Sequence, residues 1–357
     1  MPTPKNTTQK KTPKVQQSNG PLWKGPYEDG ITQSLLNLFL MCRERFRVKV
    51  IDGLGPSDKF RHALEYGNMW HVCEEALAKK EDPYKSLKDY ANQLLRRYPT
   101  SQEEVEKWYL VCKMQFPIYV DYWKKHPDVK ERTPLYQEEV FNVDYSLPSG
   151  RVVRLKGKFD SVDMIGKKPA IYLQENKSKG DIDEEVLQRQ LTFDLQTMFY
   201  LVSLKKWTAD RNIGTPIHGI RYNVIRRPFS GGKGSIRQKQ ATKTTKAETL
   251  PQLIERLKVE YILPEPQYWF MRWKVMISAT DIDRFRDEFL TPILEQLCDW
   301  WDDLQKNEFK KSSLNYRTPY GIYNPLAEGL MTDVDEYVAT GSTAGLQKLE
   351  TLFPELV

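Results

Sequence analysis

The sequence predicts an α/β protein in which a short mixed sheet is flanked by helices and preceded by a helical N-terminal extension. Two observations carry this prediction. Apolar residues recur at helical spacing from about residue 30 to 130. Consecutive strand-like segments then follow, and after them come a long helical segment and one more strand. This order is expected when a helix crosses a sheet.

The first helix is predicted over ITQSLLNLFLMCRERF, residues 31–46, with Thr32 as its N-cap. Three more helices are predicted at residues 66–80, 86–98 and 101–126. Ser101 and Glu104 stand three apart at the start of the last of these, which is the pattern of a capping box.

Strands are predicted at residues 136–147, 151–165, 169–178 and 218–227. The turn IGKKPA joins the second and third as a hairpin. Between the third and fourth strands, a long helix is expected from about Asp183 to Trp207. Helical or mixed segments complete the chain.

Length and composition limit the number of domains and their boundaries. The 357 residues, 39% of them hydrophobic, suffice for one large domain or two smaller ones. Residues 1–22 are rich in Pro, Thr, Gln and Lys, so we expect a disordered basic tail. No linker composition interrupts the remainder, so residues 23–357 are expected to form a single domain. Without an apolar run of membrane-spanning length or a signal peptide, the protein is expected in the cytoplasm of a cell or infected host cell.

The charge of the chain bears on the kind of partner it binds. The formal net charge of +6 suits a nucleic-acid partner without requiring one. A Gly-rich loop at residues 226–247 contains no acidic residue. It is the best candidate for phosphate contacts, although a merely solvated loop is the alternative. Its proposed nucleic-acid-binding residues are Arg226, Arg227, Lys233, Arg237 and Lys239.

The stretch ENK, in which Glu175 and Lys177 stand two apart, is the strongest chemical signal. Side chains two apart in a strand point the same way, and the hairpin brings Asp160 alongside. Two carboxylates can hold Mg²⁺ or Mn²⁺, which polarise a phosphate and lower the pKa of bound water. A neighbouring lysine can orient that water. An exposed salt bridge at a strand end is the alternative for the pair taken alone.

Two further pairs occur at helical spacing. Gly67 and His71 are four apart on an early helix, and Gln196 and Tyr200 are four apart on the long helix. Taken alone, each pair is compatible with ordinary packing. Taken in chain order, G67-N-M-W-H71, G157-K-F-D160, E175-N-K177 and Q196-T-M-F-Y200 resemble the PD-(D/E)XK nuclease superfamily, in its RecB-like and Cas4-like branch. The resemblance covers roughly residues 32–207.

The resemblance implies a restriction-endonuclease-like core and a metal centre. By it, His71, Asp160 and Glu175 would ligate one or two Mg²⁺ or Mn²⁺ ions, and the backbone carbonyl of Asn176 could add a ligand. Because imidazole is a borderline ligand, a set with a histidine favours Mn²⁺ more than three carboxylates would.

The same resemblance assigns the remaining roles. Lys177 would position the attacking water, while Gln196 and Tyr200 would support the site and contact the DNA backbone. The implied activity is that of a metal-dependent DNA nuclease, in particular an exonuclease of recombination, repair or phage DNA processing. A recombination or annealing protein is the implied partner. The alternatives are a catalytically silent DNA-binding or scaffolding module of the same fold, and an RNA-directed nuclease.

One departure from that branch concerns the cysteines. Its members often carry an iron–sulfur cluster held by one early cysteine and three clustered late ones. Cys42 occupies the early position, but only Cys298 lies beyond residue 112. Four thiolates are needed, so no cluster is expected and Cys42 is expected in the core. With Cys73 and Cys112, these cysteines form no CxxC pair, so four free thiols are predicted.

Overall fold

A computed structural model describes residues 22–126, 131–167, 169–192, 194–229, 235–306, 333–334 and 336–356. The predicted tail, apart from Leu22, and the predicted phosphate contact Lys233 lie outside the described residues. No helix of the described part is long and apolar enough to cross a membrane.

A six-stranded mixed sheet forms the centre of the molecule, with the order β1-β4-β5-β6-β7 and with β3 on β4. Its strands are β1 (Ile31–Thr32), β3 (Arg132–Ser146), β4 (Val152–Ile165), β5 (Ala170–Lys179), β6 (Ile217–Arg226) and β7 (Phe270–Met276). The β1–β4 and β5–β6 pairs are parallel, and the other pairs are antiparallel. The predicted mixed α/β fold is therefore confirmed.

The edge of β4 opposite β3 is shared by two strands. β1 pairs with Leu155 and Lys156, and β5 pairs with the segment from Ser161 to Ile165. The intervening residues 157–160, which spell GKFD, pair with neither. The sheet is therefore open on this edge at Asp160.

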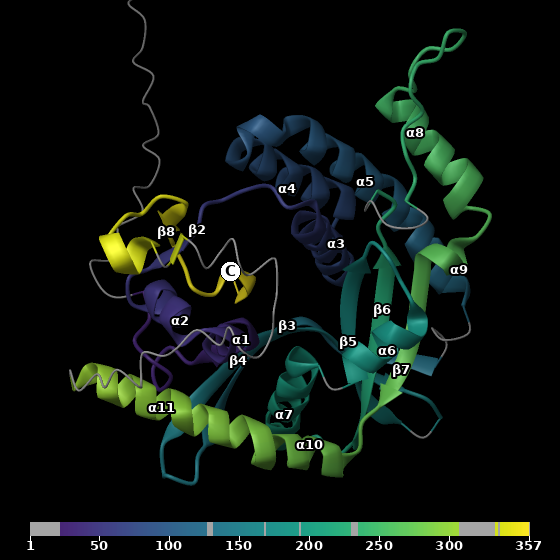
Figure 1. The fold of residues 1–357 in the computed structure, drawn as a ribbon. Helices are drawn as coiled ribbons and strands as arrows, with labels where there is room; N and C mark the ends of the chain where they lie inside the picture. Colours follow the sequence, from purple (N-terminus) through teal and green to yellow (C-terminus); the bar gives the residue numbers. More distant parts are fainter. Residues whose placement is uncertain are drawn as a thin grey trace, which may run out of the picture.

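Helices cover both faces of the sheet (Figure 1). One face packs on α1 (Gln33–Met41), α7 (Leu195–Asp210) and α11 (Thr291–Gln305) in the larger hydrophobic core. The other faces α3 (His62–Ala78), α4 (Pro83–Arg97) and α5 (Gln102–Lys125), which build the second core. Other helices in the described part of the chain are α2 (Arg43–Val50), α6 (Glu184–Thr192), α8 (Leu250–Arg256), η3 (Leu257–Ile262), α9 (Pro266–Trp269), α10 (Ala279–Phe285) and η4 (Arg286–Leu290), with single turns at η1 (Pro99–Ser101) and η5 (Pro354–Leu356).

Two predicted helices are each divided in two. The first is interrupted at Cys42, whose extended backbone ends α1 and whose sulfur accepts from the N–H of Arg45 at the start of α2. The predicted helix from Asp183 to Trp207 is α6 and α7, with Asp194 capping α7 through the N–H of Thr197. In both cases a side-chain cap satisfies backbone groups that a continuous helix would have paired internally.

Other end signals had mixed outcomes. The predicted Thr32 cap is confirmed, because its side chain accepts from the N–H of Leu35. The predicted capping box at Ser101 is wrong: a 3₁₀ turn, Pro99–Ser101, precedes α5 and the Ser101 side chain makes no cap. β1, β7 and the small sheet of β2 (Leu54–Pro56) with β8 (Leu346–Lys348) had no predicted counterpart.

Candidate active site

Asp160 lies where β4 and β5 separate. Beyond the Ser161–Gln174 pair the ladder stops, and the Asp160 carboxylate accepts from the N–H of Asn176 at 2.7 Å. A side chain thus replaces the missing ladder bond between the strands. One carboxylate oxygen, Oδ2, is fixed by this bond, and the other, Oδ1, faces His71.

Glu138 approaches from β3 through an unusual backbone. Phe141 and Tyr136 both contact the larger core although they are five residues apart, so the regular alternation of faces must shift between them. Glu138 lies within this interval and has a positive φ of 50°. This left-handed conformation is uncommon for a non-glycine residue and concentrates at functional sites.

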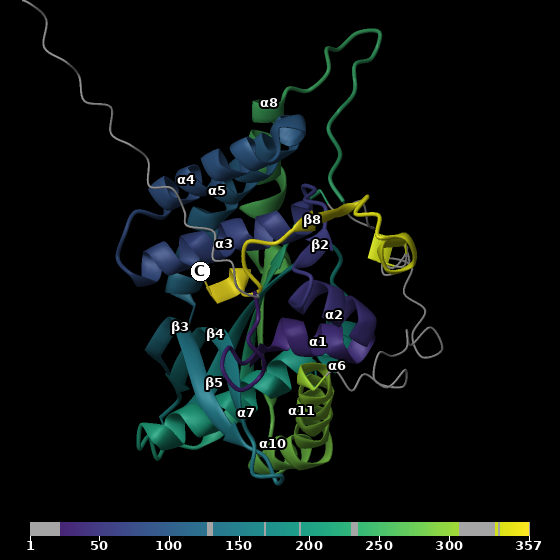
Figure 2. The same ribbon diagram turned by 90° about the vertical axis from the view of Figure 1, so that its left-hand side faces the viewer.

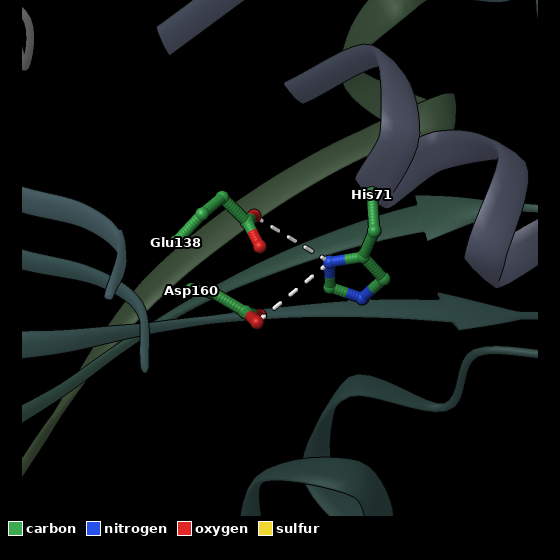
Figure 3. Close-up of side chains that lie close together, drawn as sticks. All are labelled: His71, Glu138 and Asp160. Carbon is green, nitrogen blue, oxygen red and sulfur yellow. Dashed lines mark ion pairs between the residues drawn. The ribbon is translucent and has the colours of Figure 1, made fainter. Parts of the chain in front are cut away.

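His71 comes from α3, on the face turned to the sheet. One turn earlier, α3 passes close to β5 at Gly67, where an added Cβ would make only an ordinary contact with Ser178 Oγ, at 3.5 Å. His71 Nδ1 is 3.7 Å from Asp160 Oδ1 and 3.8 Å from Glu138 Oε1 (Figure 3). One ligand atom from each of these residues lies within 4.8 Å of the others. We call His71, Glu138 and Asp160 the metal triad.

The electrostatics of the metal triad favour a cation. Burial lowers the pKa of His71, but Asp160 and Glu138 outweigh that effect and raise it to about 9. The metal-free imidazole therefore carries a proton at neutral pH, and a metal ion bound to His71 would displace it. Burial raises the pKa of Asp160, and Glu175 and Glu138 raise it further against the opposing effect of His71. Carboxylates crowded together in this way are stabilised by a positive charge placed between them.

Two buried carboxylate oxygens also fit this interpretation. Among the described residues, Glu138 Oε1 and Glu175 Oε2 have no hydrogen-bond partner. The second oxygen of Glu138 is held by Lys158 at 2.9 Å, and Lys158 is held in turn by Glu75 at 3.0 Å. A buried carboxylate oxygen without a donor is unfavourable unless something else, such as a metal ion, satisfies it.

Glu175, Lys177 and Gln196 form a second, hydrogen-bonded group. Lys177 Nζ lies 2.7 Å from Glu175 Oε1 and 2.8 Å from Gln196 Oε1, and Gln196 Nε2 donates to Glu175 Oε1 at 2.6 Å. These residues come from β5 and from the first turn of α7. Glu175 is outside the metal triad, but its charge raises the pKa of both His71 and Asp160.

Lys177 is surrounded by acids. Burial lowers its pKa, but Glu175, Asp160 and Asp194 outweigh burial and raise the pKa above its ordinary value. The side chain is therefore a charged donor at neutral pH.

The other predicted site residues lie at different depths. Tyr200 is one turn beyond Gln196, and its ring packs edge-on against Phe141 and Phe159 in the larger core. Asn176 contributes its N–H to Asp160, and its side-chain oxygen accepts from Gln174 and Asn223.

The predicted nucleic-acid contacts divide into two groups. Arg226 does not belong to the loop: it is the last residue of β6, is buried, and stacks on Tyr268 at 4.0 Å. Arg227 lies beside the end of β5 and donates to the carbonyl of Ser178 at 2.9 Å. Arg237 and Lys239 are exposed at the start of an arm, residues 235–249, that projects past α8 (Figures 1 and 2).

Comparison with known proteins agrees with this geometry. The family model for the PD-(D/E)XK nuclease superfamily matches residues 31–273, which is more than half of the chain. The chain therefore belongs to the PD-(D/E)XK nuclease superfamily, whose members are metal-dependent nucleases. No curated protein matches the sequence.

Glu138 is the member of the metal triad that was not predicted from the sequence. The run QEEV in a predicted strand contains two adjacent acids, and regular alternation would send them to opposite faces. The local change of alternation near Glu138 decides which one reaches the site, and this change has no clear sequence signal.

Proposed function

We propose that the protein is a metal-dependent deoxyribonuclease, in particular an exonuclease. The observation that carries the proposal is the placement of the metal triad beside the Glu175–Lys177–Gln196 group. The first collects oxygen and nitrogen ligands, and the second supplies a charged donor.

The residues fit a divalent ion. His71, Glu138 and Asp160 would hold it, and Glu175 would add a further carboxylate, with the carbonyl of Asn176 as an additional ligand. When bound, such an ion polarises the scissile phosphate and lowers the pKa of a coordinated water. With a histidine in the set, we propose Mn²⁺ as at least as good a cofactor as Mg²⁺.

The protein's own groups then orient the reaction. Lys177, held by Glu175 and Gln196, would offer a charged donor to the attacking water or to the phosphoryl oxygens. Gln196, on α7, fixes Glu175 and Lys177 relative to each other through its side-chain amide. We assign Tyr200 to the support of this turn of α7 through its packing on Phe159. Hydrolysis by this arrangement requires no covalent intermediate.

The finer assignments rest on the four motifs. They support membership of the RecB-like and Cas4-like branch, without an iron–sulfur cluster. All four cysteines are buried and free, and Cys42 packs at the junction of α1 and α2. We further propose that residues 23–357 act as a single cytoplasmic nuclease domain, working on DNA ends in recombination, repair or phage DNA processing beside an annealing protein.

Cleavage of end-labelled linear DNA and closed circular DNA tests this function. Wild type, Lys177→Ala and Asp160→Asn are compared with Mn²⁺, Mg²⁺ or EDTA. Lys206→Ala, nearly three turns along α7 from Gln196, is the matched control. We expect metal-dependent loss of linear DNA, survival of circles, and no cleavage by the two site variants. Binding of DNA without cleavage by any metal-loaded form would favour the silent DNA-binding module, and preference for matched RNA would favour the RNA-directed nuclease.

A further inference from the structure

Cationic and aromatic side chains lead away from Lys177 along the ends of β5 and β6. Lys179 is two residues beyond Lys177 in β5, and its carbonyl accepts from the N–H of Arg227 at 2.7 Å. The Arg227 guanidinium lies over the same strand end, donating to the carbonyl of Ser178 at 2.9 Å and to its Oγ at 3.1 Å. Lys177, Lys179 and Arg227 therefore place three cations at the ends of β5 and β6.

Further cationic and aromatic side chains lie on α3 and α5. His62, the first residue of α3, stacks on Trp108 with ring centres 5.1 Å apart and planes 7° apart. The ring centres of Trp108 and Phe229 are 5.9 Å apart, and Lys107 Nζ lies 4.4 Å from the centre of the Phe229 ring. We call Lys179, Arg227, His62, Lys107 and Phe229 the basic stripe.

The charges of the basic stripe are close enough to oppose one another. Burial lowers the pKa of Lys179, and Lys177 and Arg227 lower it further. Burial likewise lowers the pKa of His62, with Arg227 and Lys107 acting in the same direction. His62 is therefore mainly neutral, whereas Lys177, Lys179 and Arg227 repel one another until an anion lies among them.

Acidic neighbours only partly offset this charge. Asp194 lies near Lys179 but is occupied as the cap of α7, and Glu104 lies near His62. Among the described residues, neither Lys179 nor Lys107 forms an ion pair with a carboxylate.

The outer end of the basic stripe meets the base of the arm. Ile236, near the start of the arm, donates its backbone N–H to the carbonyl of Pro228, the residue before Phe229, at 2.9 Å. From there the arm carries four further exposed cations, Arg237, Lys239, Lys243 and Lys246. A bidentate pair between Arg256 and Glu248 fixes the other end of the arm to α8.

We propose that the basic stripe binds a single strand of nucleic acid that leads from the metal site toward the arm. Cations spaced along strand ends suit successive phosphates, and a half-buried aromatic ring among them suits a stacked base. Duplex phosphates would use the same cations, but paired bases could not stack on Phe229. The inference deepens the proposed nuclease function and rests on it for the position of the cut.

Equilibrium binding tests the basic stripe without cleavage. The full-length protein in EDTA is titrated against a fluorescent oligothymidylate and against a blunt duplex, at several salt concentrations. The variants are Lys107→Ala, Lys179→Ala and Phe229→Ala, with Lys206→Ala as the control, since Lys206 pairs with Asp210 far along α7. Thermal melting establishes that each variant is folded.

The expected results separate charge from stacking. Each lysine variant should weaken oligothymidylate binding and reduce the slope of log affinity against log salt by about 0.7. Phe229→Ala should weaken it by about fivefold to 100-fold without changing the slope. Lys206→Ala should bind like wild type.

Other outcomes overturn the inference in distinct ways. If folded stripe variants bind oligothymidylate like wild type while wild type cuts DNA, the proposed role of the basic stripe is wrong and the proposed nuclease function is retained. If Phe229→Ala weakens blunt duplex equally, the single-strand assignment is wrong. If wild type never cuts but the stripe variants lose binding, the proposed function fails and the binding surface remains.

Discussion

At the scale of single residues, Glu138 is the sharpest test of the site. Its Oε1 faces His71 and lacks a hydrogen bond among the described residues, while Oε2 is held by Lys158. Glu138→Gln replaces one ligand oxygen by a donor amide. We expect Mn²⁺ affinity, measured by titration calorimetry, to fall by at least about 10-fold to 100-fold, which is the loss typical when a group that only supports a ligand is removed.

Glu139→Gln provides the matched control for this change, because Glu139 is the adjacent acid and lies outside the metal triad. Equal loss of Mn²⁺ affinity in both variants would mean that general negative charge, and not the position of Glu138, attracts the ion.

Gly157 shows why a motif glycine can be structural. A Cβ there would lie within 2.5 Å of Phe141 Cε1 and 3.1 Å of Tyr200 Cε1. Gly157→Ala should therefore overpack the larger core and lower the free energy of unfolding by about 1–3 kcal/mol in urea titrations. Gly214→Ala is the control, since a Cβ at Gly214 would contact nothing within 4 Å. Equal stability of the two variants would contradict the packing role.

The sequence could predict the residues at the centre of the site better than their surroundings. Glu175 and Lys177 share a face because a strand has a period of two, and this period is readable from the sequence. Glu138 was not predictable, because a shift of alternation is a backbone event that depends on neighbouring strands. The exact depth of Tyr200 likewise depends on two phenylalanines from β3 and β4.

At the scale of elements, a buried ionic network ties the strands behind the site together. Asp163 on β4 accepts from Arg132 on β3 and Arg221 on β6, both at 2.8 Å, and Asp163 and Arg221 are fully buried. Gln174 on β5 also accepts from Arg221. This network joins β3, β4, β5 and β6, and its Asp163 lies three residues along β4 from Asp160.

Asp163→Ala should strongly destabilise the sheet. It leaves the Arg221 guanidinium buried without its carboxylate, which costs about 3–5 kcal/mol in comparable buried pairs. Denaturant unfolding measures the change, with Glu288→Ala in the exposed Arg284–Glu288 pair as a control that should change little. A similarly small effect for both would show that water or other groups compensate Arg221.

Element boundaries show what local signals omit. Periodicity found most helices and four strands, because apolar spacing is a local property. The breaks at Cys42 and Asp194 were missed, since both lie inside uninterrupted helical patterns and are set by tertiary packing. The two-residue β1 and the β2–β8 pair are too short to produce a period and depend on partners more than a hundred residues away.

At the scale of the whole molecule, the site joins the two hydrophobic cores. His71 is on α3, whose other face packs into the second core, while Gln196 is on α7 of the larger core. β3, β4 and β5 carry the acids between these layers. A ligand bound here would therefore be held by elements from both cores.

Metal binding should consequently stabilise the fold as a whole. An ion that binds only the native state adds about 2.7 kcal/mol at a concentration 100 times its dissociation constant. For a chain of this size, we expect Mn²⁺ to raise Tm by a few degrees in thermal scans, and EDTA to reverse the rise. Asp160→Asn should abolish the shift and raise the Tm of the metal-free protein, because it removes one of the crowded charges while retaining an oxygen acceptor for the N–H of Asn176. A Tm rise of equal size in Asp160→Asn would place the stabilising ion elsewhere on the molecule.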